Sequence, residues 1–553
     1  MFAHCKEGRV SRLVIRSIIV AFALALAGAF SAAPALAHNP AIVTRNGPIK
    51  GTSIFGVEGY LGIPYAVPPV GDLRWMPPVP SGRFPGGVFH ANQFGNFCTQ
   101  PGGVGAEDCL TLNVFTPNIK KNSDKKTPLP VMFWIHGGGL VDDGSFDFDP
   151  SPLVLGGNVI VVTINYRLGF LGFFAQSALD AEGHTDGNYG LMDQQLALKW
   201  VNDNIAAFGG DPDRITIFGE SAGGQSVYAN LASPTAAGLF EGAIAESGAY
   251  TEFQPYFNFI VSLSDGETVG GQGTPSGDSV ATALGCPGPP TETLAETAAC
   301  LRALPAATVI KNEPATIYPF VDGTILTQTP GSAFASGEFN QVPIISGGNH
   351  DEWRIFVANE FDFAGPTAAE YPGAVLALWG SPLNLFVDAL YPLSNYIPLV
   401  GVTAAPGVAL GASGTDGIFA CPERNSVQSL SRFVTTYAYE FNDPSPPALL
   451  HPVGTFPLGA YHGSELQFLF DINERFAGFN PFTAGEDTLS AAMVAYWTQF
   501  ATTGNPNSAS EPTWPQYDST TDEFQSLVPP TPVTEATGSF DKDHLCSLLW
   551  NAI

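Results

Sequence analysis

The sequence predicts an α/β fold in which helices cover a central, mostly parallel β-sheet. Two observations carry this prediction: short apolar runs recur along the chain, and an amphipathic helical pattern lies between two of them. A third observation concerns size. A chain of 553 residues has room for several domains, but it shows no composition break and no internal repeat, so we expect one large domain.

Five apolar runs are expected to form strands. Most have apolar side chains on successive residues, which suits central strands that are buried on both faces. Glycines follow the first run after one intervening residue, His136, as they do where a strand ends in a turn. The five runs are Val131–Ile135, Val159–Ile164, Ile215–Phe218, Val342–Ser346 and Thr435–Phe441.

Two segments are expected to be helical. In Met192–Phe208 the apolar residues recur at three- and four-residue steps, which is typical of an amphipathic helix. The apolar stretch Phe361–Gly414 breaks its period often. We interpret it as a helical cap over the sheet.

The composition excludes several classes of function. The chain has 22 Lys+Arg against 51 Asp+Glu, a net charge of −29. A nucleic-acid binder, or a protein that docks on anionic lipid, needs clustered basic side chains. With 45% hydrophobic and only 13% charged residues, the chain is too apolar to be disordered. It has no Cys-x-x-Cys motif and no Cys/His cluster with zinc spacing, so we expect no metal site.

Residues 1–37 have the pattern of a secretory signal peptide. Four basic residues precede an apolar run, Ile18–Phe30, and the small-residue stretch Ala35–Ala37 follows. We expect cleavage after Ala37, a mature domain over residues 38–553, and a secreted or periplasmic location. No later run reaches about 18 uninterrupted apolar residues, so stable membrane insertion is not expected. Six cysteines remain after cleavage, an even number that indicates disulfides, although spacing alone leaves their pairing open.

The best candidate nucleophile is Ser221. It lies in Gly219-Glu220-Ser221-Ala222-Gly223, directly after the predicted strand Ile215–Phe218 and before a plausible helix. In this context the serine occupies a strained turn from strand to helix, and the small flanking residues avoid clashes there. The alternative is a Gly/Ser-rich connection without chemistry.

A serine nucleophile also needs hydrogen-bond donors for the oxyanion that it creates. His136-Gly137-Gly138-Gly139 follows the predicted strand Val131–Ile135, the place at which lipases and esterases have such a loop. We expect the N–H groups of Gly138, Gly139 and Ala222 to be the donors. His136 is expected to be structural.

The base and the acid follow from chain order, which in this architecture is Ser, then Asp or Glu, then His. Four histidines come after Ser221: His350, His451, His462 and His544. His350 precedes the best acids, His451 lies in a proline-flanked stretch, and His544 adjoins the terminal cysteine. We therefore expect His462 to be the general base. The acid is expected just after the strand Val342–Ser346, where Asp351 and Glu352 are equally suitable.

Further motifs make the chain resemble the type-B carboxylesterase/lipase family, which includes the cholinesterases and large fungal lipases. The resemblance extends over most of residues 45–550. The motifs that carry it, besides those around Ser221 and Gly137, are Leu61–Ala66, Gly71–Trp75, Glu107–Val114, Asn165–Gly169, Gly187–Gln194, Phe208–Pro212, Phe500–Asn507 and Trp514–Pro515.

The resemblance implies the α/β-hydrolase fold and a role for several residues. It implies Glu352 as the triad acid, and it supports His462. It also implies disulfides Cys98–Cys109, Cys286–Cys300 and Cys421–Cys546. Two ion pairs, Arg74–Glu107 and Arg167–Asp193, are implied as parts of the scaffold.

The chain departs from the family pattern in three places. Trp353 replaces the glycine that follows the acid, and Leu140 stands where an aromatic residue often follows the three glycines. The loop between Cys98 and Cys109 is short and has no tryptophan. In cholinesterases this loop carries a tryptophan that receives choline by cation–π contact, and in the large lipases it forms a lid, so we expect a more open gorge here.

The expected function is hydrolysis of a small-molecule carboxylic ester through an acyl-enzyme, without a cofactor. One alternative is a triacylglycerol or sterol-ester lipase of the same family. Another is a non-catalytic, cholinesterase-like binding protein, but such relatives tend to lose a triad member and this chain retains all three candidates. Neither the natural ester nor the oligomeric state follows from the sequence.

Overall fold

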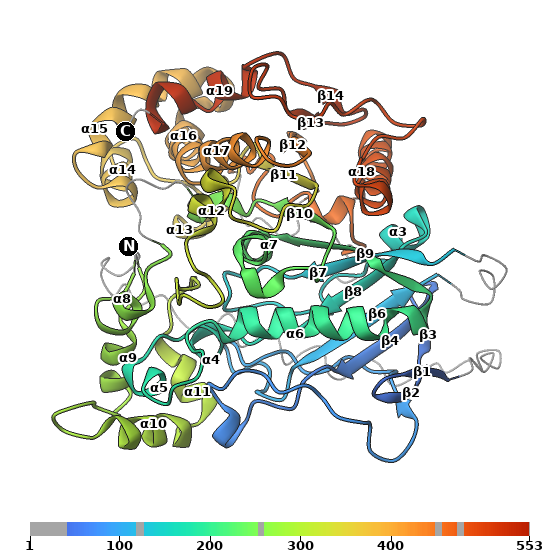
Figure 1. Ribbon diagram of the computed structural model, residues 1–553. Helices are drawn as coiled ribbons and strands as arrows, with labels where there is room; N and C mark the ends of the chain where they lie inside the picture. Colours follow the sequence, from blue (N-terminus) through green and yellow to red (C-terminus); the bar gives the residue numbers. More distant parts are fainter. Residues whose placement is uncertain are drawn as a thin grey trace, which may run out of the picture.

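An eleven-stranded sheet crosses the molecule and carries helices on both faces (Figure 1). The computed structural model describes residues 41–117, 127–252, 259–271, 273–447, 456–472 and 481–551. The predicted signal peptide, with its cleavage site at Ala37, and the histidine His451 lie outside the described residues.

The strand order in this sheet is β14-β13-β12-β11-β10-β9-β7-β8-β6-β4-β3. All neighbours from β13 to β8 are parallel, and the pairs beyond them at each edge are antiparallel. The strands are β3 (Thr52–Ile54), β4 (Val57–Pro64), β6 (Thr111–Thr116), β7 (Leu129–Ile135), β8 (Ile160–Ile164), β9 (Gly210–Glu220), β10 (Gly242–Glu246), β11 (Ile344–Asn349), β12 (Thr436–Phe441), β13 (Gln525–Leu527) and β14 (Val533–Thr534). A small second sheet consists of β1 (Ile42–Thr44), β2 (Gly47–Lys50) and β5 (Phe89–His90).

The five predicted strands all belong to the large sheet, as β7, β8, β9, β11 and β12. Sequence reasoning missed β10, whose residues Gly-Ala-Ile-Ala-Glu include only one large apolar side chain. It also missed the antiparallel edge strands. The prediction of an α/β fold with a mostly parallel sheet is confirmed.

The described α-helices lie around this sheet. They are α3 (Ser151–Gly157), α4 (Gly169–Gly172), α5 (Ser177–Asp180), α6 (Tyr189–Asn204), α7 (Ala222–Ala232), α8 (Leu263–Thr268), α9 (Gly277–Ala283), α10 (Leu294–Ala303), α11 (Ala306–Val309), α12 (Pro330–Ser336), α13 (Arg354–Glu360), α14 (Tyr371–Trp379), α15 (Leu383–Leu390), α16 (Leu393–Gly414), α17 (Cys421–Leu430), α18 (Ala484–Thr503) and α19 (Ser539–Asp543).

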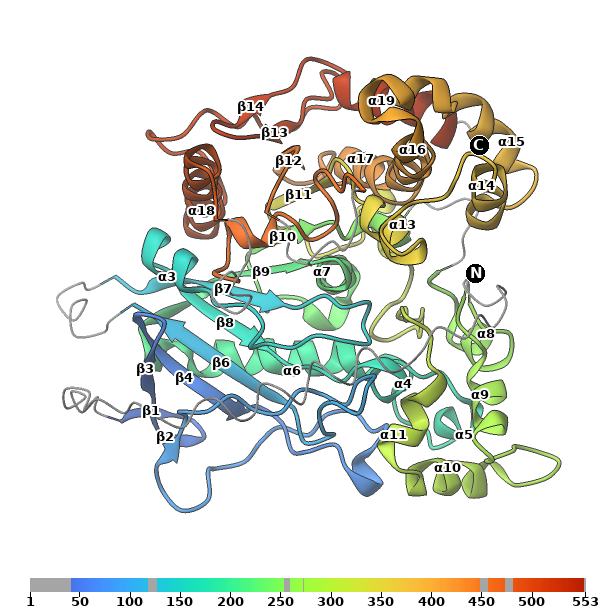
Figure 2. The same cartoon turned by 180° about the vertical axis from the view of Figure 1, so that it is seen from behind.

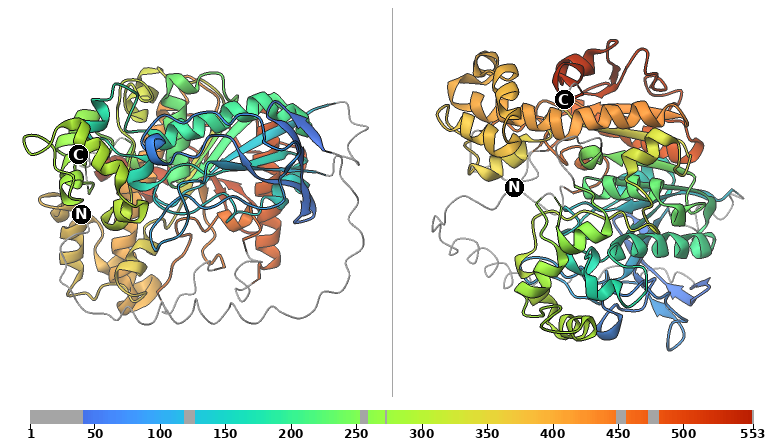
Figure 3. Two further views of the ribbon diagram at one scale, coloured as in Figure 1. Left: turned by 90° about the horizontal axis from the view of Figure 1, so that it is seen from below. Right: turned by 60° about the vertical axis from the view of Figure 1, so that its left-hand side comes forward.

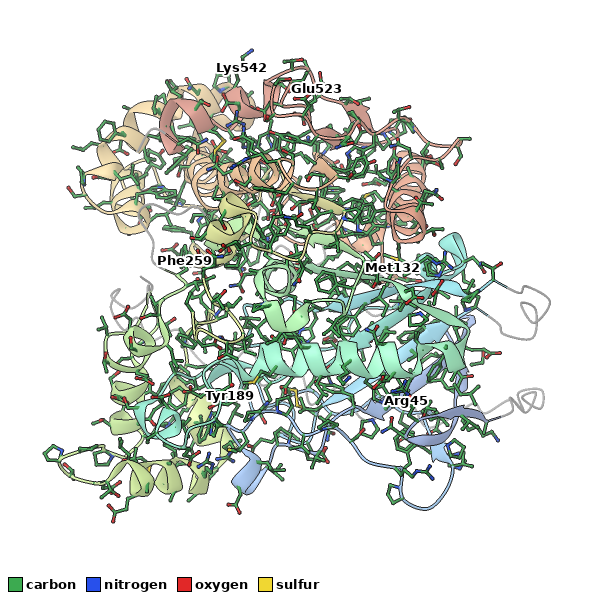
Figure 4. The ribbon with its side chains drawn as sticks, in the orientation of Figure 1. Arg45, Met132, Tyr189, Phe259, Glu523 and Lys542 are labelled. Atoms are coloured by element: carbon green, nitrogen blue, oxygen red, sulfur yellow. A yellow bond between two sulfur atoms is a disulfide. The ribbon has the colours of Figure 1, made fainter. Side chains whose placement is uncertain are left out.

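Two apolar cores fill the space between the sheet and these helices. Along β7, Val131, Phe133 and Ile135 face the core that contains α6 and α7. Met132 and Trp134 alternate with them and face the core that contains α3 and α18. This is the period of two that a strand imposes. The view from below in Figure 3 shows α6 and α18 on opposite sides of the sheet, and Figure 4 labels Met132.

The apolar stretch predicted as a cap is helical, as α14, α15 and α16 show. These helices enclose a third apolar core with α17 and the C-terminal residues, and Figure 2 shows them above α8–α10. The helical run Leu393–Leu430 is long and apolar enough to cross a membrane by length and composition. Half of its most apolar window is buried inside the fold, so that finding is weak evidence for a span.

Covalent and ionic links fix several of these elements to one another. Disulfides join Cys98 to Cys109, Cys286 to Cys300 and Cys421 to Cys546, with Cα–Cα distances of 5.0, 5.7 and 5.2 Å. Arg74 pairs with Glu107 through both carboxylate oxygens at 2.6 Å, and Arg167 pairs with Asp193 at 2.8 Å. The three disulfides and the two ion pairs are those that the family resemblance implies.

Candidate active site

Ser221 lies at the junction between strand β9 and helix α7. Its backbone has φ +56° and ψ −123°, and such a φ is uncommon for a residue with a side chain. The Ser221 N–H donates to Glu246 O at 2.9 Å, and Ser221 O accepts from Gln225 N at 2.8 Å. These bonds hold a strained turn that places the hydroxyl at the carboxyl end of the parallel strands, where ligands bind in open α/β sheets.

The glycines on both sides of Ser221 are required by close packing. A Cβ atom on Gly219 would lie 2.6 Å from Ile135 O, and one on Gly223 would lie 2.0 Å from the same oxygen. Neither distance is possible for a real Cβ. The Gly-x-Ser-x-Gly pattern thus reflects how tightly this turn packs against the end of β7.

His462 links Ser221 to a buried carboxylate. Its Nε2 lies 2.8 Å from Ser221 Oγ, and its Nδ1 lies 2.5 Å from Glu352 Oε2. Glu352 is fully buried. Its other oxygen accepts from Ser247 Oγ at 2.5 Å and from Asn349 N at 2.7 Å. The structure therefore brings the three residues predicted from the sequence into one chain of hydrogen bonds.

Asp351, the other acid that the sequence allowed, has partners other than the His462 ring. One of its oxygens lies 2.6 Å from Arg354 Nη2, and the other accepts from Ala460 N at 3.0 Å. The Asp351 N–H donates to Ala460 O at 2.9 Å. These bonds join the loop that carries Glu352 to the loop that carries His462.

The three-glycine loop after β7 lies against the same serine. A Cβ on Gly137 would be 3.2 Å from Ser221 Cβ. Gly138 and Gly139 have φ of +80° and +61°, and a Cβ on Gly138 would lie 2.4 Å from Asp142 O. Only glycine fits these positions without strain.

The third predicted donor, Ala222, is the first residue of α7. The N–H groups in the first turn of a helix have no intrahelical acceptor, and they carry the positive end of the helix dipole. The geometry therefore places backbone donors of two elements, the glycine loop and α7, around Ser221.

His136, which precedes the glycines, is part of the scaffold, as expected. It is buried, its ring stacks on Tyr166 with centroids 4.5 Å apart, and burial lowers its pKa to about 4. The Tyr166 hydroxyl donates to His136 O at 2.7 Å. The imidazole is therefore neutral at physiological pH and packs as an aromatic ring.

Two buried acids flank His462, and only one was expected. Glu220 Oε1 lies 3.3 Å from His462 Nε2, on the side of the ring that faces Ser221. Burial lowers the pKa of His462, but the charges of Glu220 and Glu352 and the Glu352 hydrogen bond outweigh burial and raise that pKa to about 9. Burial also raises the pKa of Glu220 well above its ordinary range. The proton affinity of His462 therefore depends on whether Glu220 is charged.

Sequence reasoning also missed an aromatic wall beside His462. The rings of Phe356 and Phe419 lie 5.4 and 5.1 Å from the imidazole centroid. Tyr250 and Trp353 extend the wall, at 5.5 and 6.2 Å from Phe419. Phe356 belongs to α13 and Trp353 directly precedes it, whereas Phe419 and Tyr250 lie before α17 and after β10, so no sequence spacing connects the four.

The histidines rejected in the sequence analysis have other partners. His544 is buried between Asp416 and Glu440, at 2.7 and 2.5 Å. Burial opposes protonation of His544, but the two carboxylates raise its pKa to about 10. His350 lies 3.1 Å from both Asp351 and Asp543. Neither imidazole contacts Ser221.

Two groups of side chains among the described residues have a spacing that could hold a metal ion, and neither includes Ser221 or His462. The first is His350, Asp543 and His544, where both ring nitrogens of His544 are already bonded to carboxylates. The second is Asp180, Asp186 and Glu267.

The chain was compared with known proteins, and a family model described as "Carboxylesterase family" matches residues 38–371 and 404–541. Human cocaine esterase is 35% identical over 514 residues, which cover 87% of this chain and 86% of that protein. Para-nitrobenzyl esterase of Bacillus subtilis (strain 168) is 34% identical over 507 residues, which cover 87% of this chain and 93% of that protein.

The chain is also similar to solved structures of esterases. A thermophilic PNB esterase superposes with a TM-score of 0.72 at 31% identity, and the match covers 91% of this chain and 99% of that one. A second PNB esterase gives a TM-score of 0.71 at 31% identity, with 91% and 98% covered. The chain therefore has the α/β-hydrolase fold of these esterases.

Proposed function

The chain belongs to the carboxylesterase family and is a carboxylic ester hydrolase, and from that premise we propose that Ser221, His462 and Glu352 carry out the reaction through an acyl-enzyme. The observation that supports this assignment best is the hydrogen-bonded chain from Glu352 through His462 to Ser221, with links of 2.5 and 2.8 Å. The residues in the chain have the types and the order of a serine-hydrolase triad.

In the first step Ser221 Oγ attacks the carbonyl carbon of the ester while His462 Nε2 accepts the hydroxyl proton. Glu352 keeps the other ring nitrogen protonated and stabilises the imidazolium that forms. The N–H groups of Gly138, Gly139 and Ala222 stabilise the tetrahedral oxyanion. The alcohol then leaves with the proton from His462, and the acyl group stays on Ser221.

In the second step water replaces the alcohol. His462 Nε2 removes a proton from the water, the resulting oxygen nucleophile attacks the acyl carbon, and the same N–H groups stabilise the second oxyanion. Collapse of this intermediate releases the acid and returns the proton to Ser221. Every proton transfer uses His462, so activity requires a neutral imidazole at the start of each step.

The substrate is a small-molecule ester, and the aromatic wall supports one with an apolar acyl or alcohol group. Phe356 and Phe419 lie within 5.4 Å of the His462 ring centroid, next to the proposed base. Relatives named for cocaine and para-nitrobenzyl esters are consistent with bulky aromatic substrates. We therefore propose aryl and benzyl esters as the first compounds to test.

The experiment combines active-site labelling with hydrolysis. A fluorophosphonate probe is expected to label the wild-type enzyme at Ser221, and para-nitrobenzyl and aryl esters are expected to be hydrolysed. Ser221→Ala should abolish labelling and lower turnover by roughly 10⁴-fold or more. Its thermal stability should stay the same, because Ala and Ser meet the same strain at this φ. Unchanged hydrolysis in Ser221→Ala would contradict the assignment, and a folded wild type without labelling or hydrolysis would indicate the non-catalytic alternative.

One observation favours a second candidate, hydrolysis of long-chain esters at a lipid surface. Helices α14–α16 expose large apolar side chains, among them Leu385 (65% exposed), Phe386 (52%) and Leu399 (75%). The family model does not match residues 372–403, which hold these side chains and a single charged residue, Asp388. Emulsified triglyceride hydrolysed faster than short soluble esters would favour the lipase. The reverse order is expected for the esterase.

We also propose that residues 1–37 direct export and that residues 38–553 form one hydrolase domain outside the cytoplasm. The basic and apolar pattern of residues 1–37 supports this assignment, and so do three disulfides, which persist in oxidising compartments. N-terminal sequencing of the exported protein should start at His38. Enzyme that is found only inside the cell, with its first residues intact, would contradict the proposal.

A further inference from the structure

Three carboxylates from separate segments converge in the helical lobe, which we define as α5, α8, α9 and α10. Asp180 ends α5, Asp186 lies in the loop before α6, and Glu267 belongs to α8. One carboxylate oxygen of each lies within 4.8 Å of the others. Figures 1 and 2 both show the helical lobe at one side of the molecule, away from α7 and the turn that holds Ser221.

Two of these carboxylates are buried, and each has one oxygen without a hydrogen-bond donor among the described residues. Asp186 is 2% exposed and Glu267 is 9% exposed. Asp186 Oδ2 and Glu267 Oε1 accept no hydrogen bond from the described residues. A buried carboxylate oxygen without a donor destabilises a fold, so this arrangement needs a compensating group.

The neighbouring acids, in contrast, have donors. Asp278 accepts from Ser177 Oγ at 2.8 Å and from Gln176 Nε2 at 2.9 Å. Asp322 accepts from Asn188 Nδ2 at 2.9 Å. The local fold thus supplies donors to its other carboxylates, and it leaves one oxygen each of Asp186 and Glu267 without a donor among the described residues.

The arginine of the helical lobe does not balance the cluster. Arg302 forms a two-point ion pair with Glu182, at 2.6 Å for its Nη2. The charged groups that act on Asp186 are carboxylates. Burial and the charges of Asp180, Glu267 and Asp322 raise the pKa of Asp186 to about 7.

Backbone and side-chain bonds hold the three segments together. Phe174 N donates to Gly187 O at 3.0 Å, directly after Asp186. Asn188 Nδ2 donates to Phe320 O at 2.7 Å, and Leu263 N, at the start of α8, donates to Val321 O at 3.0 Å. Asp186 and Glu267 cannot separate without the loss of such bonds.

We propose that Asp180, Asp186 and Glu267 form a Ca²⁺ site that fastens α5 and α8 to the loop before α6. Carboxylate oxygens without nitrogen or sulfur ligands suit a hard cation. Ca²⁺ binds oxygens at about 2.3–2.6 Å, so opposite ligands are about 5 Å apart, in line with the separation of these oxygens. Asp180 is exposed and gives the ion access from solvent, and water completes the shell.

The test is calcium binding and thermal unfolding of the full-length enzyme. After EDTA treatment and removal of the chelator, calorimetric titration with CaCl₂ should show one saturable site per chain, and Ca²⁺ should raise Tm. MgCl₂ should bind at least tenfold more weakly, because Mg²⁺ demands a smaller octahedral shell. Absence of saturable Ca²⁺ binding, or equal binding of Mg²⁺, would overturn the proposal.

Charge-matched variants separate the site from a general effect of calcium on an acidic protein. Asp186→Asn with Glu267→Gln should bind Ca²⁺ at least tenfold more weakly and lose the Ca²⁺-dependent rise in Tm. In EDTA this double variant should unfold at or above the wild-type Tm, because its two amides no longer repel each other as the two carboxylates do. The control, Asp213→Asn with Glu338→Gln, changes the same residue types at exposed positions and should behave as wild type.

Asp180→Asn tests the site without replacing a buried residue. The residue is exposed, so the variant is expected to fold as wild type and to bind Ca²⁺ about tenfold more weakly. Esterase activity at 25 °C should be the same in all variants, because the helical lobe contributes no residue around Ser221. Wild-type Ca²⁺ affinity in both cluster variants, or an equal loss in the control, would refute the assignment.

Discussion

The charge of Glu220 raises the pKa of His462, and with it the pH at which this proposed base becomes neutral and active. Its carboxylate lies 3.3 Å from His462 Nε2, and its charge favours the protonated imidazole, which cannot accept the Ser221 proton. Catalysis needs neutral His462, so activity must fall as pH drops through the pKa of this histidine. The acidic limb of kcat/KM therefore reports that pKa, which burial lowers and the charges of Glu220 and Glu352 raise to about 9.

We predict that Glu220→Gln moves this acidic limb to lower pH by about one unit or more, because an opposite charge this close shifts a pKa by 1–3 units. The measurement is the pH profile of kcat/KM for a neutral aryl ester, with exposed Asp213→Asn as the control. An unchanged limb would mean that Glu220 is uncharged in the pH range of the limb. Such a result would show that burial, which raises the pKa of Glu220, keeps its carboxyl protonated there.

Single residues also show why the sequence could reveal part of the site and not the rest. Ser221 and the glycines around it are adjacent in the chain and belong to a turn with a known motif, so their pattern predicts their geometry. Phe356 and Phe419 lie on different segments and meet at His462 only through packing. Asp186 and Glu267 are 81 positions apart (267 − 186), and their convergence depends on how α8 is placed.

Among the elements, the glycine loop after β7 is the most sensitive to a single added carbon. Gly138→Ala brings a Cβ within 2.4 Å of Asp142 O, so the loop must move and the proposed oxyanion donors must move with it. We predict a loss of about 10²–10³ in kcat, the effect of removing one such donor. The assay is steady-state hydrolysis of an aryl ester with KM determined separately.

Gly209→Ala is a matched control for that variant. Gly209 has φ +85°, close to the +80° of Gly138, but a Cβ there meets no atom within 4 Å. Its backbone strain is therefore similar and its packing effect absent, so kcat should stay near that of wild type. Equal losses of kcat in the two variants would attribute the effect to backbone strain and not to the oxyanion loop.

The strands show what an apolar pattern can and cannot predict. β7, β8 and β12 are rich in large apolar or aromatic residues, and their burial on both faces follows from that composition. β10 is equally buried, but glycine, alanine and a buried glutamate fill the space between β9 and β11. Helix α7 packs closely against β10, because a Cβ added to Gly224 would lie only 2.4 Å from Glu246 O. The composition of β10 alone therefore does not predict that it is a buried central strand.

Disulfides of different span should contribute differently to stability. Cys421–Cys546 closes a loop of 125 residues, and Cys98–Cys109 closes one of 11. In the chain-entropy model the longer loop restricts the unfolded chain more, by roughly 2 kcal/mol. We predict that the double Cys→Ala variant at 421 and 546 loses that much more free energy of unfolding than the one at 98 and 109.

The comparison is controlled because all four cysteines are buried, so the two variants remove similar side chains from similar surroundings. The measurement is urea unfolding of wild type and both variants under oxidising conditions. A larger loss in the 98/109 variant would show that native packing in the short loop, and not loop entropy, sets the order.

At the scale of the whole molecule the dominant property is negative charge. Removal of residues 1–37 would take away four basic residues and one acidic residue, and 18 − 50 gives a net charge of −32 for the mature enzyme. The long-range field should therefore repel an anionic ester before it reaches Ser221.

Salt screens this field, with a Debye length of about 30 Å at 0.01 M and about 8 Å at 0.15 M. We predict that kcat/KM for an anionic aryl ester rises several-fold between these ionic strengths, because encounters become more frequent. A neutral ester of the same leaving group should change little, and a cationic one should slow down. Measuring the three esters in parallel separates the field from any effect of salt on the fold, since a structural effect would act on all three alike. Equal salt responses would therefore mean that local groups at the entrance, and not the net charge, control how substrates approach.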